Sequence, residues 1–248
     1  MNRVALITGV AGGIGHATAQ MFTKKGWHVF GVDIQPVLEH AGVKQFIHAD
    51  ISQPAAWEKI CGKIDDHGGR LDTLVNNAAI QVCKPLIETS IDEWDAVMAT
   101  NVRSVFLGSR YTYPLLNRCC GSIVNVGSVH AIATSAGIAA YAASKGALLS
   151  LTRAMALEFG PNIRVNTVLP GAVDTAMLHA GLCRGHELGE NGYELVQKLG
   201  KKHVMGRVGQ PDEIARIIYF LADNKQSTFM TGQAMIVDGG ATARLSTE

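Results

Sequence analysis

Three polar side chains in the middle of the chain have the types and the spacing of a proton-transfer site. Tyr141 and Lys145 are four residues apart, so on a helix they share one face and can approach closely. An ammonium group beside a phenol favours the phenolate, and we expect Lys145 to lower the pKa of Tyr141 from its usual value of about 10. Such a phenol would serve as a general base near neutral pH, and Ser128 would hold the substrate oxygen.

A second group of residues, at the start of the chain, has the composition of a phosphate-binding turn. The run from Thr8 to Gly15 reads Thr-Gly-Val-Ala-Gly-Gly-Ile-Gly and lies between a β-branched run and a helical pattern. Glycines let the backbone approach a phosphate, and the N–H groups that open the helix favour negative charge. Its Gly-x-x-x-Gly-x-Gly spacing differs from the general Gly-x-Gly-x-x-Gly fingerprint, but Asp33 ends the next apolar run, where a carboxylate can bind a ribose.

The elements that must position these residues are strands and helices that alternate along the whole chain. The patterns predict strands near residues 4–8, 27–32, 44–49, 71–76, 121–127, 163–168 and 234–238, and helices near 13–25, 54–65, 91–117, 141–160 and 211–222. No domain boundary is visible. We therefore expect residues 1–248 to form one Rossmann-type α/β domain, a doubly wound parallel seven-stranded sheet with helices on both faces.

Several polar segments follow the predicted strands at their carboxyl ends, where such sheets bind ligands. Each also has a structural interpretation. An isolated Tyr-x-x-x-Lys pair is typical of a surface tyrosine along a lysine stem, Ser128 could cap its loop, and Asn77 could be a turn residue. The chemical interpretation is favoured because all of these segments fall at one edge of one sheet.

Residues 176–205 form the exception to the alternating pattern. This stretch has no predicted strand and is too long for an ordinary connection. We expect a substrate lid, with an inert insertion as the alternative. The residues that suit a lid are Met177, Leu178, Gly181, Leu182, Gly185, Gly189 and Gly192.

In the order of its motifs the chain resembles the short-chain dehydrogenase/reductase family from Arg3 to about Gly240. Ala79 is a departure, since it adds a methyl group where the family usually has glycine. The motifs that carry the resemblance are Thr8-Gly9-x-x-x-Gly13-x-Gly15, Asp50-Ile51, Asn76-Asn77-Ala78, Asn101-Val102, Ser128, Tyr141-x-x-x-Lys145, Pro170-Gly171, Gly232-Gln233 and Val237-Asp238-Gly239-Gly240.

The resemblance implies an oxidoreductase that interconverts a secondary alcohol and a ketone by hydride transfer. It implies Tyr141 as the general acid and base, Ser128 as the group that holds the carbonyl or alkoxide oxygen, and Lys145 as a ligand of the nicotinamide ribose. Asn101 would hold a water in a proton relay, which a helix interior permits only where its backbone hydrogen bonds are opened. The alternative is that Asn101 caps the helix that continues to residue 117.

The expected cofactor is NAD. Asp33 should repel a ribose 2′-phosphate, and Val10, Ile34 and Gln35 offer no cation to neutralise one, although Asp33 could merely cap a turn. By resemblance, Val173 would lie near the carboxamide and Thr175 near the phosphates. The expected cofactor-binding residues are Gly9, Gly13, Ile14, Gly15, Asp33, Ile34, Asp50, Ile51, Asn77, Ala78, Tyr141, Lys145, Pro170, Gly171, Val173 and Thr175.

A small polar substrate is expected, such as a sugar, a polyol or a short hydroxy acid. Gln81, His130, Ser128 and Tyr141 are the substrate-binding candidates, and their segments resemble those of 3-hydroxybutyrate and sugar dehydrogenases of the family. Ile138 stands where the hydroxybutyrate enzymes commonly have a carboxylate-binding lysine, which favours a neutral substrate, although Arg184, Lys201 or Lys202 could supply the charge. The alternatives are a 3-oxoacyl or apolar ketone reductase, a packing role for His130, and a dinucleotide sensor without turnover.

Composition narrows the partners and the compartment. The 248 residues carry a formal net charge of +1 and no basic tract, so we expect neither nucleic acid nor a membrane as partner. Five cysteines without a Cys-x-x-Cys pair favour a reduced, cytoplasmic compartment, and we expect no metal. By resemblance to the family, the helices near 91–117 and 141–160 pack between subunits of a homotetramer.

Overall fold

The computed structural model describes residues 2–36, 42–182 and 192–243. Within these ranges seven parallel strands form one sheet in the order β3-β2-β1-β4-β5-β6-β7, which confirms the predicted fold class. The winding direction reverses between β1 and β4, so the ligand crevice is expected at their carboxyl ends. The strands are β1 (Val4–Thr8), β2 (His28–Asp33), β3 (Gln45–His48), β4 (Thr73–Asn76), β5 (Ser122–Val126), β6 (Arg164–Pro170) and β7 (Ala234–Val237).

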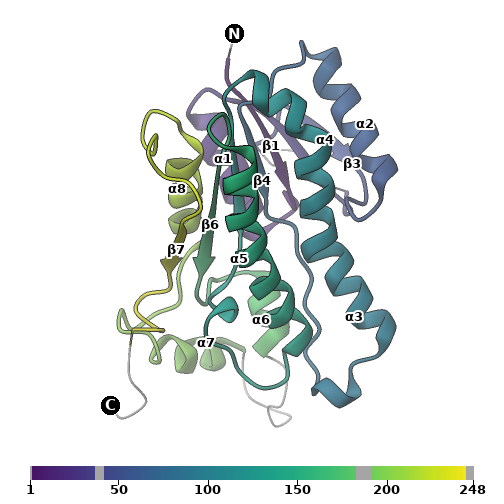
Figure 1. Ribbon diagram of the computed structural model, residues 1–248. Helices are drawn as coiled ribbons and strands as arrows, with labels where there is room; N and C mark the ends of the chain where they lie inside the picture. The colour runs from purple at the N-terminus through teal and green to yellow at the C-terminus, as the bar shows by residue number, and fades with distance from the viewer. Residues whose placement is uncertain (1, 37–41, 183–191, 244–248) are drawn as a thin grey trace.

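Helices cover both faces of the sheet (Figure 1). On one face lie α1 (Gly13–Lys24) and α8 (Pro211–Ala222); on the other lie α2 (Pro54–Asp66), α4 (Ser104–Arg118) and α5 (Ala139–Phe159). Alternate residues of β1 feed the two cores, because successive strand side chains point to opposite faces. Val4 and Leu6 join the core with Trp57, whereas Ala5 and Ile7 join the core with Phe22.

The helix predicted near residues 91–117 contains an irregular turn. It begins as α3 (Ile91–Met98), whose cap Ser90 forms a reciprocal capping box with Glu93, and it continues through η2 (Ala99–Arg103), a π-helical turn, into α4. The short 3₁₀ turns η1 (Leu86–Glu88) and η3 (Val129–Ala131) follow β4 and β5. The long helix therefore widens by one π turn at its middle, next to the end of β4.

The described part of the expected lid consists of two short helices, α6 (Ala176–Leu182) and α7 (Gly192–Gly200). No strand occurs in the described residues of this stretch, as predicted. Arg184, Gly185 and Gly189 lie outside the described residues. Among the helices that the structure describes, none has the length and apolar character needed to cross a membrane.

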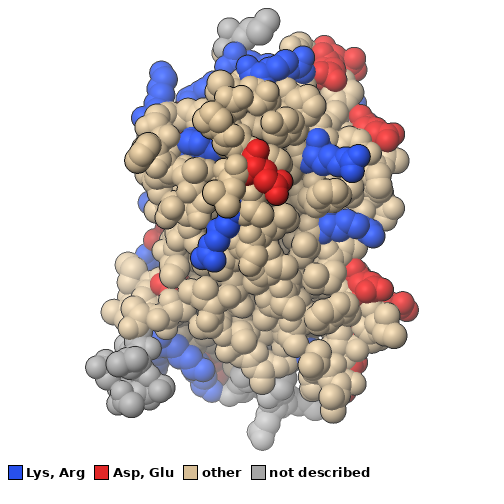
Figure 2. All heavy atoms as spheres, in the orientation of Figure 1, with Lys and Arg blue, Asp and Glu red and all other residues tan. Residues whose placement is uncertain are grey.

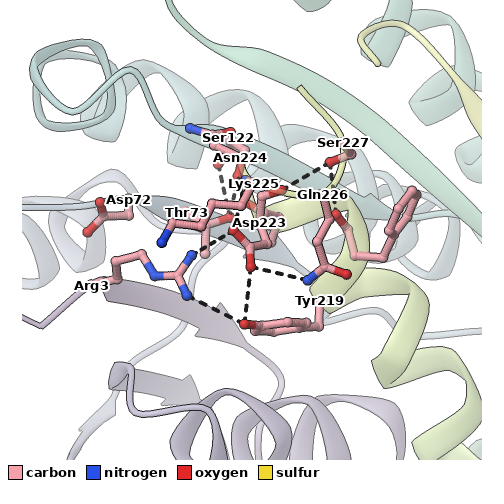
Figure 3. Close-up of polar contacts among 12 residues, drawn as sticks. Arg3, Asp72, Thr73, Ser122, Tyr219, Asp223, Asn224, Lys225, Gln226 and Ser227 are labelled. Atoms are coloured by element: carbon pink, nitrogen blue, oxygen red, sulfur yellow. Dashed lines mark hydrogen bonds and ion pairs between the residues drawn. The ribbon is translucent and has the colours of Figure 1, made fainter. Parts of the chain in front are cut away.

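A polar cluster at the amino ends of the strands, away from the expected ligand crevice, connects the start of β1 to the end of α8 (Figure 3). The Arg3 guanidinium lies 2.7 Å from Asp223 Oδ1, just beyond the end of α8. The Asp223 carboxylate also accepts hydrogen bonds from the hydroxyl of Tyr219 (3.2 Å), the backbone N–H of Lys225 (3.0 Å) and the amide of Gln226 (3.1 Å). We call this cluster the amino-edge brace. It consists of Arg3, Tyr219, Asp223, Lys225 and Gln226.

Candidate active site

The glycine turn between β1 and α1 has the geometry of an anion cradle. Gly9 and Gly13 adopt left-handed conformations, with φ of +73° and +54°, that favour glycine. A Cβ at Gly15 would lie only 1.9 Å from the Gly9 carbonyl oxygen, so the turn closes tightly on itself. No side chain caps the start of α1 at Gly12, and nothing lies within 4 Å of a Cβ built there. The first N–H groups of α1 thus remain available to a phosphate, and the turn fits a dinucleotide.

Asn77 and Thr8 brace this turn from the end of β4. The Asn77 amide donates to the carbonyl oxygens of Thr8 (2.9 Å) and Gly9 (3.0 Å). In return, the Thr8 hydroxyl oxygen accepts from the backbone N–H groups of Asn77 (3.0 Å) and Ala78 (3.1 Å). Asn77 therefore shapes the glycine turn through its side chain, a role that its interpretation as a turn residue does not include.

Asp33, at the end of β2, is fixed beside the same turn. Its Oδ2 accepts from the Ala11 N–H and its Oδ1 accepts from the Gln35 N–H, both at 2.9 Å. The turn-capping alternative is thus real, but each carboxylate oxygen has a second lone pair for a ribose hydroxyl. Ile34 next to it is 62% exposed, and Asp50, which binds the Ser52 N–H, precedes buried Ile51. These residues lie along the carboxyl ends of β2 and β3.

The segment at the end of β6 leads to the other side of the turn. Pro170 is the last residue of β6, and Gly171, Val173 and Thr175 follow it. The Gly171 N–H donates to the Val237 carbonyl (3.0 Å), and Val173 forms an isolated parallel bridge with Gly209. The Thr175 hydroxyl accepts from the Leu178 N–H (3.3 Å), and a Cβ at Gly13 would lie 3.1 Å from the Thr175 methyl carbon. Thr175 thus lies beside the glycine turn.

Ser128 and Tyr141 meet beyond the end of β5. The Ser128 hydroxyl oxygen accepts from the His130 N–H (3.2 Å) and so caps η3, and the side chains of Ser128 and Tyr141 are also hydrogen-bonded to each other. Capping and contact with the phenol are therefore both properties of Ser128. This places a hydroxyl and a phenol where one substrate oxygen can contact both.

Lys145 lies one turn along α5 from Tyr141, inside the protein. Its ammonium group donates to the Val126 carbonyl (2.8 Å) and lies 5.4 Å from the centroid of the Tyr141 ring. Tyr141 is 8% exposed and Lys145 is 2% exposed, so the alternative of a surface tyrosine along a lysine stem is wrong.

The expectation that Lys145 lowers the pKa of Tyr141 is also wrong for this arrangement. Burial raises the pKa of Tyr141 to about 12, against the opposing effect of the Ser128 hydrogen bond, and burial lowers the pKa of Lys145 to about 8. The reason is that removal from water penalises the charged form of each group. At neutral pH the phenol is protonated and is a hydrogen-bond donor.

Asn101 occupies the π turn η2 and joins the β4 loop to α5. Its Oδ1 accepts from the Ile80 N–H, and its Nδ2 donates to the Ile80 carbonyl, both at 2.9 Å, and to the Ser144 hydroxyl at 3.0 Å. The N-cap alternative is wrong, because the helix is capped at Ser90. A π turn opens the regular backbone hydrogen bonding, which is the condition that a relay at this residue requires.

Ser144 is a site residue that the sequence analysis missed. Its hydroxyl donates to the Tyr141 carbonyl (2.7 Å) and accepts from Asn101. Its place between Tyr141 and Lys145 was a signal, but a serine inside a helix ordinarily bonds its own preceding turn.

The predicted substrate residues occupy different surroundings. The His130 ring packs edge-on against the Tyr141 ring, with centroids 5.8 Å apart, and its Nδ1 lies 2.9 Å from the Thr134 hydroxyl. The Gln81 amide donates to the Met177 carbonyl of α6 (2.7 Å). Ile138 is buried at the start of α5, and Lys201 and Lys202 are exposed after α7. The structure thus brings His130 to Tyr141 and turns Gln81 toward α6.

Comparisons with known proteins agree with this geometry. A family model described as "Enoyl-(Acyl carrier protein) reductase" matches residues 9–242. The chain is 35% identical over 252 residues to meso-2,3-butanediol dehydrogenase of Serratia marcescens, covering 98% of this chain and 95% of that protein. It is 36% identical over 253 residues to cyclopentanol dehydrogenase of Comamonas testosteroni, covering 98% of each. The ligand-free aldohexose dehydrogenase of Thermoplasma acidophilum superposes with a TM-score of 0.93 at 30% identity, covering 99% of this chain and 96% of that one.

Proposed function

The chain belongs to the short-chain dehydrogenase/reductase family and is an oxidoreductase of alcohols and ketones, and we propose that it uses NAD to interconvert a small polar secondary alcohol with its ketone. The observation that carries the proposal is the buried contact between Ser128 and Tyr141, with Lys145 one helical turn away. A hydroxyl, a protonated phenol and an ammonium at one sheet edge suit proton transfer to or from a substrate oxygen.

Each residue of this site has a separate role in the proposed reaction. The Tyr141 phenol donates a proton to the carbonyl oxygen during reduction and takes one from the alcohol during oxidation. The Ser128 hydroxyl holds the same oxygen, Lys145 binds the cofactor's ribose, and Asn101 holds the relay water. The bound nicotinamide supplies or accepts the hydride. The chain's own contribution is thus to orient the substrate and to move the proton.

NAD rather than NADP is proposed because of Asp33. Two backbone N–H groups hold its carboxylate beside the glycine turn, where a 2′-phosphate would meet its negative charge. We expect kcat/KM to be at least tenfold higher with NAD than with NADP, and replacement Asp33→Ser to reduce that ratio. Equal values for the two cofactors, or a preference of the wild type for NADP, would contradict the assignment.

A sugar or polyol is the proposed substrate class, with a short hydroxy acid next. His130 and Ser128 border the Tyr141 phenol, and buried Ile138 has no charge for a carboxylate. Two of the similar proteins are named for a diol and an aldohexose, which supports a substrate rich in hydroxyl groups. The similar protein named for cyclopentanol favours the second candidate, an apolar alcohol or ketone.

One experiment separates these classes. The absorbance of reduced nicotinamide is followed with aldohexoses, polyols, 3-hydroxy acids and cyclopentanol, using wild type and His130→Ala. We expect turnover of the polar alcohols and a higher KM for them in His130→Ala. If only hydrophobic alcohols react and His130→Ala is unchanged, the polar-substrate proposal is wrong; if no alcohol reacts although NAD binds tightly, a dinucleotide sensor is the better reading.

We further propose a cytoplasmic homotetramer in which residues 176–205 cover the substrate. The thiols of Cys61, Cys119 and Cys120 are free, which fits a reducing compartment. The helices α6 and α7 follow the cofactor-side segment that ends at Thr175, where a cover over the substrate would have to lie.

A further inference from the structure

The Gln81 side chain connects two segments that are far apart in the sequence. Its Nε2 donates to the Met177 carbonyl oxygen across a separation of 96 residues, at 2.7 Å. One turn further along α6, a Cβ at Gly181 would lie 2.9 Å from the same Nε2. The Gln81 amide is therefore packed against the surface of α6, and residue 181 must be small for the amide to lie there.

The backbone that carries Gln81 is itself fixed to the catalytic helix. Ile80, the preceding residue, bonds the Asn101 side chain through both its N–H and its carbonyl, and Asn101 reaches Ser144 on α5. Hydrogen bonds on either side of the peptide link between Ile80 and Gln81 thus connect α6 with Asn101 and with the helix of Tyr141. At its other end α6 follows Thr175, whose hydroxyl accepts from the Leu178 N–H and whose methyl group lies beside Gly13.

We propose that Gln81 is a positioning residue that holds α6 at the substrate end of the sheet. The proposal rests on the proposed function, since it assumes that α6 borders the substrate. Gln81 takes no part in proton transfer. The alternative, that its amide binds the substrate directly, predicts that α6 does not depend on Gln81 when no substrate is present.

Hydrogen exchange of the protein without cofactor or substrate tests this role directly. Gln81→Glu keeps the shape of the side chain and removes the donor, and Gln81→Ala removes the contact. For the amides of residues 179–182 we expect exchange about fivefold faster in both variants, the change that loss of one ordinary hydrogen bond produces. Unchanged exchange in both variants would overturn the proposal; unchanged exchange in β1 and β5 serves as the check that each variant is folded.

Gln233 provides a matched control. Its amide also donates to a backbone carbonyl, that of Thr231 at 3.2 Å, but it lies on an exposed segment before β7. Gln233→Ala should leave exchange in α6 unchanged. Acceleration as large as that in Gln81→Ala would mean that loss of any such amide loosens α6, and would refute a specific role of Gln81.

Gly181→Ala gives a test in which the sign of the effect changes with the background. With Gln81 present, the added methyl group meets the amide, and exchange in α6 should rise. With Gln81→Ala, the methyl group has room and alanine favours the helix, so the same change should slow exchange. The same direction of change in both backgrounds would show that the amide does not pack on Gly181, and the proposal would fail.

Kinetics separate the positioning role from the proposed function. Gln81→Glu should raise the KM of the reacting alcohol about fivefold or more, with a smaller effect on kcat and little effect on NADH affinity. A fall in kcat with unchanged KM would contradict positioning. If wild type turns over no alcohol while α6 exchange still depends on Gln81, then the proposed function is wrong and the contact stands.

Discussion

At the scale of single residues, the proton chemistry depends on a balance between burial and hydrogen bonding. Tyr141 and Lys145 lie in a site where burial opposes the charge of both groups, which leaves the phenol protonated and the ammonium easier to deprotonate. Ser128 acts against burial by bonding to the phenol. The protonation state of the site is thus set mainly by burial, which the Ser128 hydrogen bond opposes at Tyr141.

Removal of the phenol oxygen should abolish most of the activity. Tyr141→Phe deletes the proton donor but leaves the ring and its packing against His130, so kcat should fall about 100- to 10,000-fold while NADH affinity changes little. Steady-state kinetics and a fluorescence titration with NADH measure the two quantities. A variant that keeps more than about a tenth of kcat would show that Tyr141 is not the general acid and base. Lys145→Met should weaken both turnover and NADH binding.

The rate of alcohol oxidation should depend steeply on pH. Oxidation needs the deprotonated phenol, and because burial raises the pKa of Tyr141 to about 12, the reactive fraction grows throughout the range from pH 7 to 10. Ketone reduction uses the protonated phenol and should decline only where Lys145, with a pKa of about 8, loses its charge. Profiles of kcat/KM in both directions measure this. An oxidation rate that is highest below pH 7 would contradict the assignment.

The sequence predicts which side chains gather at the candidate site, whereas it does not predict their protonation. Tyr141 and Lys145 were recognisable from their spacing and their place after a strand. Spacing alone predicts a lowered phenol pKa, because it shows the neighbouring ammonium but not the removal of water around both groups. The roles of Asn77 as a brace and Ser144 as a partner of Asn101 depend on side-chain directions that spacing does not show.

At the scale of elements, the sheet and the regular helices follow directly from hydrophobic periodicity. The π turn at Asn101 was not visible, because one extra residue in one turn hardly changes the pattern over residues 91–117. The contact between Gln81 and α6 was invisible for another reason: it joins residues from different β-α units, 96 positions apart. Local patterns predict elements well and long-range side-chain contacts poorly.

The elements of the proposed lid should respond to ligand. Met177, Leu178 and Leu182 of α6 are only half-buried in the protein alone, so a substrate that covers them should slow the exchange of nearby amides. We expect exchange in α6 and α7 to slow several-fold when NAD and a reacting alcohol are added together. NAD alone is the control for effects of the cofactor. Equal exchange with and without both ligands would favour an inert insertion.

At the scale of the whole molecule, the amino-edge brace stabilises the fold at the edge away from the site (Figure 3). Burial acts to raise the pKa of Asp223. Hydrogen bonds from Lys225, Gln226 and Arg3 outweigh this effect and hold that pKa below its ordinary value. Its contribution to stability is therefore present above the unfolded pKa of about 3.9 and is lost as pH falls through the lower folded value.

Asp223→Ala should destabilise the protein without changing its chemistry. The change leaves the part-buried Arg3 guanidinium and the Lys225 N–H without their carboxylate acceptor, and donors that lose their partner in this way cost about 1–3 kcal/mol. Urea unfolding at pH 7 measures the loss, and the difference from wild type should shrink below about pH 4 as the carboxylate is protonated. Equal stability of the two proteins at pH 7 would show that the brace contributes nothing.

The face that carries α4 and α5 is where an assembly of subunits is expected. On the part of this face that the structure describes, charged side chains of both signs are spaced across a largely uncharged surface (Figure 2). Phe106 and Tyr113 of α4 and Leu157 of α5 are 47%, 36% and 85% exposed, and in the expected tetramer a neighbouring subunit would cover them.

Sedimentation should therefore detect a tetramer at micromolar concentration. Leu157→Glu places a charge on this face, where it would have to be buried without a partner, and should shift the protein toward smaller species. The matched control is Phe229→Glu, which changes an exposed residue outside α4 and α5 in the same way. A wild type that sediments only as a monomer would contradict the tetramer. A tetramer that withstands Leu157→Glu but not Phe229→Glu would move the essential interface to the segment before β7.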